Sequence, residues 1–538
     1  TKIEINTSDL NICLATLSLY ICVYGLVSYV VKHRLYLSEP LIALLFGIIV
    51  GPAVLGWVDP NLWKPEEDRL MGYKDSLTLA FTRITIGIQV FFAGVALPKK
   101  YLKTEFQSLI ILLLPIMAIA WFVCGFLIYE LIPRLTFMEA LVIAACITPT
   151  DPVLANSITK GRYADRSVKP SVRNIIVAES GANDGLGYPF IFLPLFCIMA
   201  RSSEEFTGPN RHLSGIIGRW IYETWLYQVT LSVVLGLAIG WIARKSLRWC
   251  EERNMLDEDN FIAYGIGLSF FCMGFLGIIG SDDLLCCFIA GNSFSWDDRQ
   301  RLAAEDAGFQ DVIDLLLNTA IFMYIGAIMP WYAFNDPVTG IIPWRIVVLG
   351  ICVMLFRRLP WVITIYKLVP AIPSVREAAF VGWFGPIGVS AIFYVQVALE
   401  YLPKDSREQV KRTIEPVVYF MVFTSILVHG ITVPASRLLM HGVTLTRTLT
   451  QPIKIPKGPT EPVNLDNIRR IGIAVPLPAY DNTTGERVVQ SIDFGAEPRR
   501  SEPSTHEHTL AEAPSQADEG QDIEAGIEHG GRTVAFSA

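Results

Sequence analysis

Long apolar runs separated by short polar loops fill the first 440 residues of the chain. A helix that crosses the hydrocarbon core of a bilayer needs about 20 predominantly apolar residues, so these runs predict membrane-spanning helices. The third run is weakened by Arg83 and Gln89, and the ninth is only 13 residues long. The thirteen predicted spans cover residues 10–31, 39–57, 77–97, 107–131, 137–159, 171–200, 219–243, 259–279, 283–295, 309–332, 343–369, 375–400 and 412–440.

The composition agrees with a membrane protein. Hydrophobic residues make up 52% of the 538 residues and charged residues only 18%, against about 25% charged residues in soluble proteins. A single soluble core stops growing at about 250–300 residues, so an apolar excess on this scale must face lipid. This excludes a soluble enzyme and a disordered chain. The net charge of −7 offers no basic footprint for nucleic acid.

The charge divides the chain into a balanced body and an acidic tail. Residues 451–538 hold 8 Lys and Arg against 14 Asp and Glu, which is nearly all of the net charge. We predict a transmembrane domain over 1–450, a membrane-proximal segment over 451–500 and a disordered acidic tail over 501–538. The tail is either a solvated terminus or a regulatory segment that binds partners.

Loop charge predicts the orientation of the spans. Counted with the adjoining ends of the spans, the loops after odd-numbered spans hold 18 Lys and Arg, and the other loops between spans hold 12. Basic residues favour the cytoplasmic side, and an odd number of spans puts the two termini on opposite sides. The N-terminus is therefore expected outside and the C-terminal tail in the cytoplasm.

The fifth span contains two prolines that flank a polar pair. Pro149 and Pro152 enclose Thr150 and Asp151, and each proline removes a backbone donor and clashes with the preceding turn. The helix is expected to break there. Irregular backbone is tolerated at membrane depth only where it is buried in protein or lines a cavity.

The sixth span concentrates polar side chains within two helical turns. Ser180 and Asp184 are four residues apart and share one face, and Glu179 and Asn183 share the neighbouring face. Ionisable residues inside a span are costly and indicate function. A purely structural polar network is the alternative.

A second interruption lies in the twelfth span, at Gly385-Pro386. If spans 1–6 and 8–13 are repeats, the fifth and twelfth spans correspond. Paired interruptions at matching positions indicate a transporter binding site near the middle of the membrane, although two unrelated kinks would look the same.

Other polar groups are candidates for supporting roles. Asp282 and Asp283 lie between spans eight and nine, where they form either an outer mouth of the site or a solvated turn. Arg357 and Arg358 interrupt span eleven and are candidate internal counter-ions. His429 is expected to be a hydrogen-bonded interior histidine, with a proton relay as the alternative. The ten cysteines lie mostly in apolar runs without a metal-binding pattern, and we interpret them as small buried hydrophobic residues.

At these motifs the chain resembles the sodium/proton exchangers of the monovalent cation/proton antiporter superfamily, and most closely their fungal plasma-membrane branch. The resemblance covers about residues 10–440. It implies an all-α polytopic membrane protein of about 13 transmembrane helices in two inverted six-helix repeats with crossed broken helices. It also implies a homodimer at the plasma membrane with a role in pH homeostasis and salt tolerance. The matching segments are Thr-Asp-Pro at 150–152, Gly-Ala-Asn-Asp-Gly at 181–185, Phe-Gly-Pro-Ile-Gly at 384–388 and Val-His-Gly-Ile-Thr-Val-Pro at 428–434.

The resemblance also implies roles for individual residues. The ion-binding aspartate of the family falls on Asp184 and its neighbour on Asn183, the broken-helix pair on Thr150 and Asp151, and the supporting pair on Glu179 and Ser180. One position departs from the family pattern. Many relatives carry an arginine in the broken twelfth span that pairs with the acid matching Glu179, and this chain has Ile387 there. The partner of Glu179 is left open between Arg357, Arg358, Arg376 and a proton.

These residues predict an exchange mechanism. Na⁺ is a hard cation that needs oxygen ligands, which Asp184, Asp151, Thr150 and Ser180 supply. A proton and a cation compete for Asp184, so alternating access would exchange cytoplasmic Na⁺, and also Li⁺ or K⁺, for external H⁺ without a cofactor. Asn183 in place of a second aspartate favours one proton per cation, and Asp151 keeps a two-proton exchange open.

Two other classes of protein compete with an exchanger. An intramembrane protease is disfavoured because neither a Gly-x-Gly-Asp motif nor a Gly-x-Ser-x-Gly motif is present; we therefore expect no enzyme. A Na⁺-coupled symporter or a cation channel of similar architecture is the remaining alternative. Opposing gradients of protons and sodium drive each other only in an exchanger.

Overall fold

The computed structural model describes residues 9–31, 35, 37–60, 73–152, 154–155, 168–202, 212–253, 255, 258–299, 301–302, 309–403 and 407–450. The chain divides into one unit over Thr1–Pro452 and another over Ile453–Ala538. The predicted segments 451–500 and 501–538 lie outside the described residues, as do several loop residues on which the predicted orientation rests.

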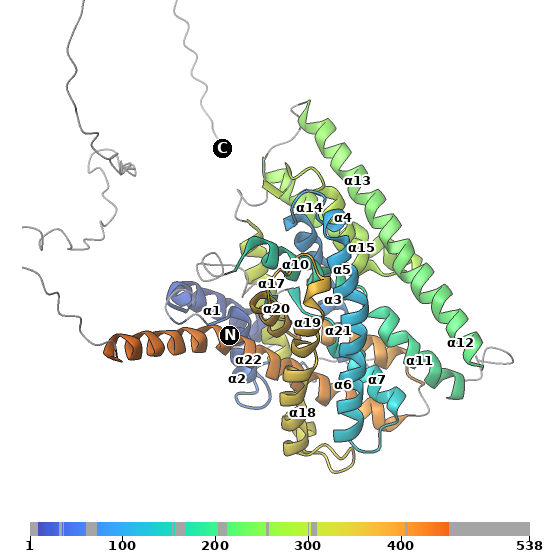
Figure 1. The fold of residues 1–538 in the computed structure, drawn as a ribbon, viewed down its shortest axis with the longest axis vertical. Coiled ribbons are helices and arrows are strands. Elements are labelled where there is room, and N and C mark those ends of the chain that lie inside the picture. Colours follow the sequence, from blue (N-terminus) through green and yellow to red (C-terminus); the bar gives the residue numbers. More distant parts are fainter. Residues whose placement is uncertain are drawn as a thin grey trace, which may run out of the picture. The chain divides into compact units, whose positions relative to one another are not determined.

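The described part of the chain is helical and contains no strand beyond one isolated bridge between Asp336 and Ile341 (Figure 1). The first half comprises α1 (Asp9–Val30), α2 (Glu39–Val50), α3 (Tyr73–Ala96), α4 (Tyr101–Thr104), α5 (Phe106–Ile111), η2 (Leu112–Ile116), α6 (Met117–Leu131), α7 (Phe137–Ile147), α10 (Pro170–Asn183) and α11 (Tyr188–Ser202). The second half comprises α12 (Leu213–Arg219), η4 (Trp220–Thr230), α13 (Leu231–Glu251), α14 (Glu258–Ile279), α15 (Asp283–Phe294), α17 (Phe309–Ala327), η5 (Trp331–Asn335), α18 (Pro343–Phe356), α19 (Leu359–Ile365), η6 (Tyr366–Leu368), α20 (Val375–Trp383), α21 (Val389–Tyr401) and α22 (Glu408–Thr450).

Every predicted span coincides with apolar helix. In the described residues seven helical segments are long and apolar enough to cross a membrane, and six shorter apolar helices occupy the remaining predicted spans. Large apolar side chains on their outer faces are exposed, such as Leu26 at 86% and Ile278 at 87%. Continuous exposed apolar surface is unfavourable in water, so these faces fit lipid. The predicted all-α, multi-pass membrane fold is confirmed.

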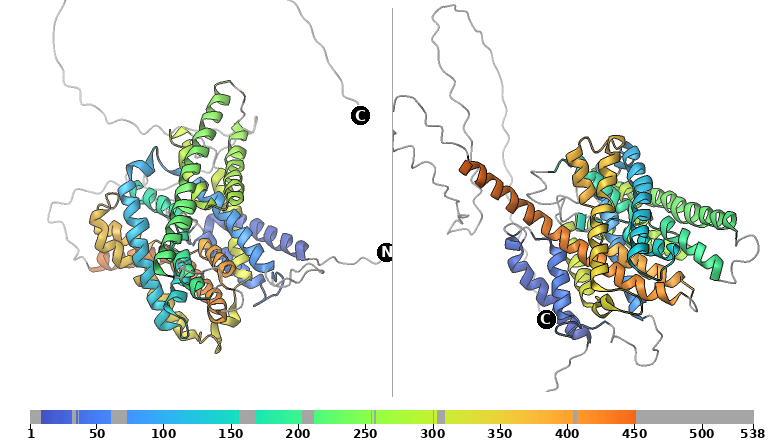
Figure 2. Two further views of the ribbon diagram at one scale, coloured as in Figure 1. Left: turned by 90° about the vertical axis from the view of Figure 1, so that its right-hand side faces the viewer. Right: turned by 60° about the horizontal axis from the view of Figure 1, so that its bottom comes forward.

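The two weakest predicted spans are among the most deeply enclosed helices. All residues of α15 are buried, and α15 packs against both α3 and α13. Figure 2 shows α13 (green) on the outside of the bundle in both views. Gly94 of α3 lies against the Phe288 carbonyl and Gly291 of α15 against the Phe91 carbonyl, so that a Cβ at either glycine would overlap the opposing backbone. Because neither helix relies on lipid contact, both tolerate the polar residues that lower their hydropathy.

The two predicted interruptions are also present, and they meet. Helix α7 ends at Ile147, shortly before Pro149, and α20 ends at Trp383, with non-helical backbone through Gly385-Pro386 until α21 begins at Val389. The Asp151 N–H donates to the Pro386 carbonyl at 2.9 Å. The crossed broken helices place free backbone groups and half-helix ends inside the bundle.

Candidate ion-binding site

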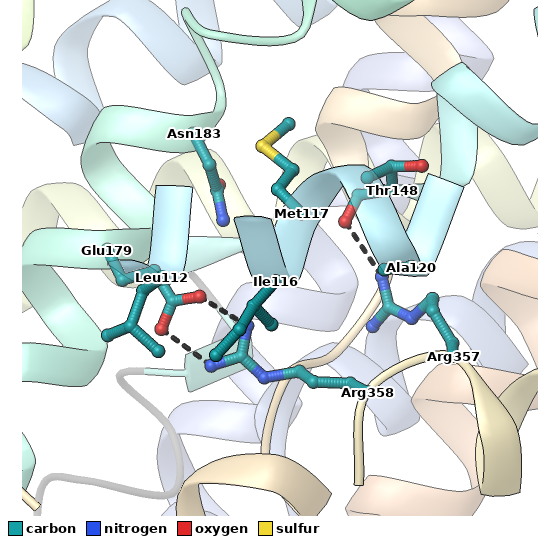
Figure 3. A pocket seen from close by; sticks show the side chains of 9 residues that line it. All are labelled: Leu112, Ile116, Met117, Ala120, Thr148, Glu179, Asn183, Arg357 and Arg358. Atoms are coloured by element: carbon teal, nitrogen blue, oxygen red, sulfur yellow. Dashed lines mark hydrogen bonds and ion pairs between the residues drawn. The ribbon is translucent and has the colours of Figure 1, made fainter. Parts of the chain in front are cut away.

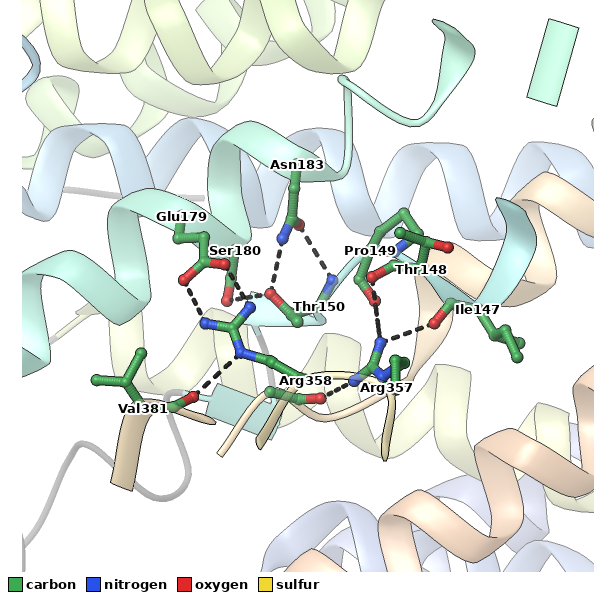
Figure 4. A network of polar contacts seen from close by, with 11 residues as sticks. Ile147, Thr148, Pro149, Thr150, Glu179, Ser180, Asn183, Arg357, Arg358 and Val381 are labelled. Carbon is green, nitrogen blue, oxygen red and sulfur yellow. Dashed lines mark hydrogen bonds and ion pairs between the residues drawn. The ribbon is translucent and has the colours of Figure 1, made fainter. Parts of the chain in front are cut away.

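A closed network of side chains holds the first interruption against α10. The Asn183 amide donates to Thr150 Oγ1 at 2.8 Å and accepts from the Thr150 N–H at 3.2 Å. Thr150 Oγ1 also lies 2.9 Å from the Ser180 hydroxyl (Figure 4). All three residues are buried. The side chains that the sequence places on neighbouring faces of α10 therefore converge on Thr150, where they replace the backbone bonds that the helix loses at Pro149.

Asp151 caps two helical segments at once. Its carboxylate accepts from the Leu154 N–H at 3.2 Å and from the Val389 N–H at the start of α21. A carboxylate at a helix N-terminus is favoured by the free N–H groups and by the helix dipole. Gly388 makes this approach possible, because a Cβ at that position would overlap the Asp151 carboxylate.

Asp184 is the most isolated acid of the cluster. It is 0% exposed, and neither carboxylate oxygen has a hydrogen-bond partner among the described residues. The Asp151 carboxylate and the Ser390 hydroxyl are its polar neighbours, and the Tyr394 hydroxyl donates to its backbone carbonyl at 2.5 Å. A buried carboxylate without a donor is strongly disfavoured as a bare anion, so this position suits a group that is neutralised by a bound proton or cation.

The partner of Glu179 is Arg358. The two guanidinium Nη atoms donate to the two carboxylate oxygens in a bidentate pair, with 2.5 Å between Nη2 and Oε2. The Nε–H donates to the Val381 carbonyl at 3.1 Å. Arg376 is exposed, and Ile387 is buried with its N–H donating to Ser425 Oγ at 2.7 Å. The partner of Glu179 therefore comes from the break between α18 and α19.

Arg357, the neighbouring arginine, binds backbone instead of a carboxylate. Its Nη1 donates to the carbonyls of Ile147, Thr148 and Pro149, at 2.7, 3.1 and 3.2 Å, and its Nη2 donates to the Gly385 carbonyl. These carbonyls belong to the C-terminal ends of α7 and α20, which carry partial negative charge. Arg357 therefore neutralises both half-helix ends.

A small cavity of about 10 Å³ lies beside these arginines. Its polar lining comes from Thr148, Glu179, Asn183 and the two arginines, as Figure 3 shows. A cavity of about 10–15 Å³ has room for one water molecule. It lies on the side of Glu179 and Asn183.

The alternative that Asp282 and Asp283 form a solvated turn is wrong, because both residues are buried, and their role at an outer mouth of the site stays a prediction. Asp282 is 0% exposed and caps α15 by accepting from the Leu285 N–H at 3.0 Å, and Asp283 pairs with Arg83 of α3 at 2.5 Å. A pair of acids after a glycine and a serine reads as a surface turn in sequence, but here it starts a helix that is buried along its whole length.

His429 is interior, as predicted, at 5% exposure. It lies 5.9 Å from the Trp383 ring and 6.0 Å from the Phe384 ring between centroids. The predicted hydrogen bond is not seen at Nδ1, which has no partner in the described part of the chain. All ten cysteines are free, and five of them are buried.

Sequence reasoning missed two residues next to Asp184, namely Ser390 and Tyr394. Both lie on α21, the half-helix that follows Gly385-Pro386, and they are four residues apart on one face. The sequence signal that could have identified them is their position just after the break. Polar residues in the first turns after a break in a membrane helix are placed close to the site that the break creates.

Comparison with known proteins supports the assignment of the fold and identifies the family. The family model described as "Sodium/hydrogen exchanger, transmembrane" matches residues 19–436. The chain is 40% identical over 466 residues to a Na⁺/H⁺ antiporter of Saccharomyces cerevisiae, covering 83% of this chain and 46% of that protein. It is 35% identical over 506 residues to Na⁺/H⁺ antiporter 2 of Zygosaccharomyces rouxii, covering 91% and 59%. The chain thus spans about half the length of these curated relatives.

A shorter relative and a solved structure extend the comparison. A Na⁺/H⁺ antiporter of Schizosaccharomyces pombe is 31% identical over 442 residues, which cover 80% of this chain and 91% of that protein. The sodium proton antiporter MjNhaP1 of Methanocaldococcus jannaschii has the same fold, with a TM-score of 0.57 at 18% identity over 82% of this chain. The chain therefore belongs to the transmembrane sodium/hydrogen exchanger family.

Proposed function

We propose that the chain is a secondary antiporter that exchanges Na⁺ for H⁺ at Asp184. The observation that carries the proposal is the Asp184 carboxylate, which is fully buried beside two crossed broken helices and has no hydrogen-bond partner among the described residues. The other two acids of this cluster already have partners. Glu179 pairs with Arg358, and Asp151 accepts from N–H groups at two helix N-termini. The names of the relatives point to the same pair of ions.

The ligands for Na⁺ would come from a small set of oxygens. Asp184 contributes both carboxylate oxygens, and Asp151 contributes lone pairs beyond those that accept its two N–H bonds, because a carboxylate has about four acceptor sites. Thr150 and Ser180 lie next to these acids and bond mainly to each other and to Asn183. Their oxygens join the shell only if this network opens, so Asp184 and Asp151 are the primary ligands. Li⁺ and K⁺ share the oxygen chemistry, and both are candidate substrates.

Competition for one carboxylate explains the coupling. A proton and a cation each neutralise Asp184, and the empty, charged site is costly to carry through a low-dielectric barrier. Alternating access would move the site only when one of the two is bound. The helices around the crossed breaks would move as a core against the helices that contain α3 and α15, which a homodimer would hold fixed in the membrane.

The cellular setting is also part of the proposal, and it rests on the fungal resemblance and on the loop charges. We place the chain in a fungal plasma membrane with its N-terminus outside and its C-terminal tail in the cytoplasm. There it would export Na⁺ in exchange for external H⁺ and contribute to salt tolerance and pH homeostasis. The tail would be available to regulatory partners.

The test is transport by the purified full chain in sealed vesicles. An imposed Na⁺ gradient should drive H⁺ in the opposite direction, and a pH gradient should drive ²²Na⁺ uptake. Asp184→Asn should lower both fluxes at least 100-fold while the variant still elutes as a folded protein. Asp336→Asn, in a loop outside the site, is the matched control and should exchange normally.

The other outcomes would refute the site or identify another class of transport protein. Full exchange by Asp184→Asn would refute the assignment of the site. Ion movement in the same direction would identify a symporter, and sodium flux without proton coupling would identify a channel. Repeating the flux measurement with Li⁺ and K⁺ defines the range of substrates.

A further inference from the structure

Helix α3 carries a row of polar side chains that the site described above does not use. Thr78, Thr82, Thr85 and Gln89 follow one another at intervals of three and four residues and therefore share one face of the helix. The three threonines are 0% exposed, and Gln89 is 6% exposed. The opposite face carries the glycines that pack against α14 and α15. A buried polar face on a membrane helix is costly and marks a functional surface.

Polar groups of α17 meet this row, and two further helices, α21 and α22, carry buried polar side chains. On α17, Tyr324 lies 2.7 Å from the Thr78 hydroxyl, and Asn318 Oδ1 accepts from Gln89 Nε2 at 2.6 Å. Helix α21 also packs on α3 and carries the buried Gln396, and α22 contributes the buried Tyr419, which lies within electrostatic reach of Tyr324. We call these eight residues the polar seam: Thr78, Thr82, Thr85, Gln89, Asn318, Tyr324, Gln396 and Tyr419.

The hydrogen bonding of the seam is incomplete. Thr85 Oγ1, Gln89 Oε1, the Tyr419 hydroxyl and both polar atoms of the Gln396 amide are buried and have no hydrogen-bond partner in the described residues. Buried polar groups in proteins are normally paired, because each unpaired group loses its hydration without replacement. A seam built only for packing would not retain so many unpaired groups in one row. They are suited to a state in which the seam opens and its polar atoms are hydrated.

One end of the seam carries a charged pair, and the other end lies near the segment with Asp184. At the start of α3, Lys74 pairs with Glu415 of α22 at 3.1 Å, and both side chains are 22% exposed. At the other end, Gly181 of α10 approaches Ala93 of α3, so the segment with Asp184 lies beside the second half of α3. The row therefore runs from the membrane face with Lys74 and Glu415 toward Asp184.

We propose that the polar seam is the closed half of the ion route, through which a hydrated alkali cation or a proton passes between that membrane face and Asp184 when α21 and α22 separate from α3 and α17. The Lys74–Glu415 pair, which bridges α3 and α22, would open with it. The inference rests on the proposed function in that the route leads to Asp184.

The first experiment measures access to the seam in the full chain. Thr82→Cys in sealed vesicles is treated with a small, membrane-impermeant thiol reagent, with and without Na⁺, against the unsubstituted chain as background. We expect labelling above background that changes with Na⁺. Ser269→Cys is the control, because Ser269 is equally buried and, like Thr82, bonds to a carbonyl of its own helix, but it lies on α14 and is not part of the seam; it should stay unlabelled. Absence of labelling at Thr82 under every ionic condition overturns the proposal.

The second experiment distinguishes the passage of an ion through the seam from its binding at Asp184. It tests the proposal even if Thr82→Cys does not fold. Gln396→Leu should reduce exchange at least tenfold while equilibrium ²²Na⁺ binding changes less than twofold, and Ser269→Ala should leave both unchanged. Unchanged exchange in Gln396→Leu overturns the seam. Failure of the proposed function shows differently, because Asp184→Asn would then keep binding and exchange while labelling at Thr82 is unaffected.

Discussion

Glu179 and Asp184 lie five residues apart on the same membrane helix, and both are buried to 2% exposure or less. Glu179 meets a bidentate arginine, whereas Asp184 has no cationic partner among the described residues and has only the Asp151 carboxylate and the Ser390 hydroxyl as polar neighbours. Under the proposed function, burial is therefore not what distinguishes the exchanging acid from the structural one. The difference is whether a permanent positive partner already satisfies the carboxylate.

The comparison makes a general point about ion sites in membranes. A permanently paired acid stays charged and cannot release its partner at each cycle. An unpaired acid must take a mobile positive charge, and this makes it a site for exchange. The predictions below test this division of roles, beginning with the largest expected effect.

Removing one partner of the Glu179–Arg358 pair should destabilise the fold most. Glu179→Gln leaves a buried guanidinium without its counter-ion, and breaking a buried pair in this way costs about 3–5 kcal/mol. Thermal unfolding in detergent measures the loss. Asp184→Asn should not lower the unfolding temperature, because it removes a charge that has no partner. A large loss in Asp184→Asn with none in Glu179→Gln would reverse the comparison.

A double replacement sharpens the same test. Glu179→Leu combined with Arg358→Met removes both charges, and apolar replacements of a buried pair are often neutral. Most of the stability lost in the single variant should return. If it does not, the pair contributes more than mutual neutralisation, for example through the Arg358 bond to Val381.

Arg357→Met should have the next largest effect. It leaves three carbonyls at the end of α7 and one at the end of α20 without this donor, and an unsatisfied buried acceptor costs about 1–3 kcal/mol. Unfolding in detergent should show a loss of that size, together with slower exchange. Arg345→Met is the control, since Arg345 donates only to the Gly340 carbonyl in the hydrogen bonds seen here. Wild-type stability in Arg357→Met would contradict the proposed neutralisation of the helix ends.

Gly388→Ala tests the close approach of Asp151 to α21. The new methyl group would overlap the Asp151 carboxylate, and overpacking of this kind costs about 1–3 kcal/mol. Exchange should fall with it, because the cap at Val389 would be displaced. Gly274→Ala on α14, where a Cβ meets nothing within 4 Å, should behave as wild type. The two variants are compared in the same flux and unfolding measurements.

Asp282→Asn should have the smallest effect. Asparagine is as good an N-cap as aspartate, so α15 should keep its stability to within about 1 kcal/mol. Exchange should persist with a changed apparent affinity for Na⁺, since one oxygen of Asp282 is buried without a partner in the described residues. A complete loss of exchange would instead place Asp282 in the ion site. The Na⁺ dependence of the initial rate decides between these outcomes.

Much of this architecture is predictable from the sequence because the membrane imposes a length and polarity on each helix. The apolar runs locate the helices, and Pro149 and Pro386 locate both breaks. Positions within the buried bundle are less predictable. Asp282 follows a glycine and a serine, which is typical of a surface turn, and only the packing of α15 against α3 and α13 shows that it is buried.

The arginine that pairs with Glu179 illustrates the same limit. The resemblance to the family suggests an arginine at the position of Ile387, but the side chain that reaches Glu179 comes from the α18–α19 break. The sequence therefore leaves three arginines open, and the direction of the Arg358 side chain decides between them. An ion pair requires only that the charged atoms meet, and arginines at different backbone positions can bring a guanidinium group to the same carboxylate.

The double bonding of the crossing has a consequence for movement. The amide of Asp151 holds the Pro386 carbonyl, and its carboxylate holds the first amide of α21. These bonds run between the two interrupted helices in both directions, so one helix cannot slide without carrying the other. During a conformational cycle the two interrupted helices must then move together as one rigid unit, and the conformational change is confined to the surfaces around them.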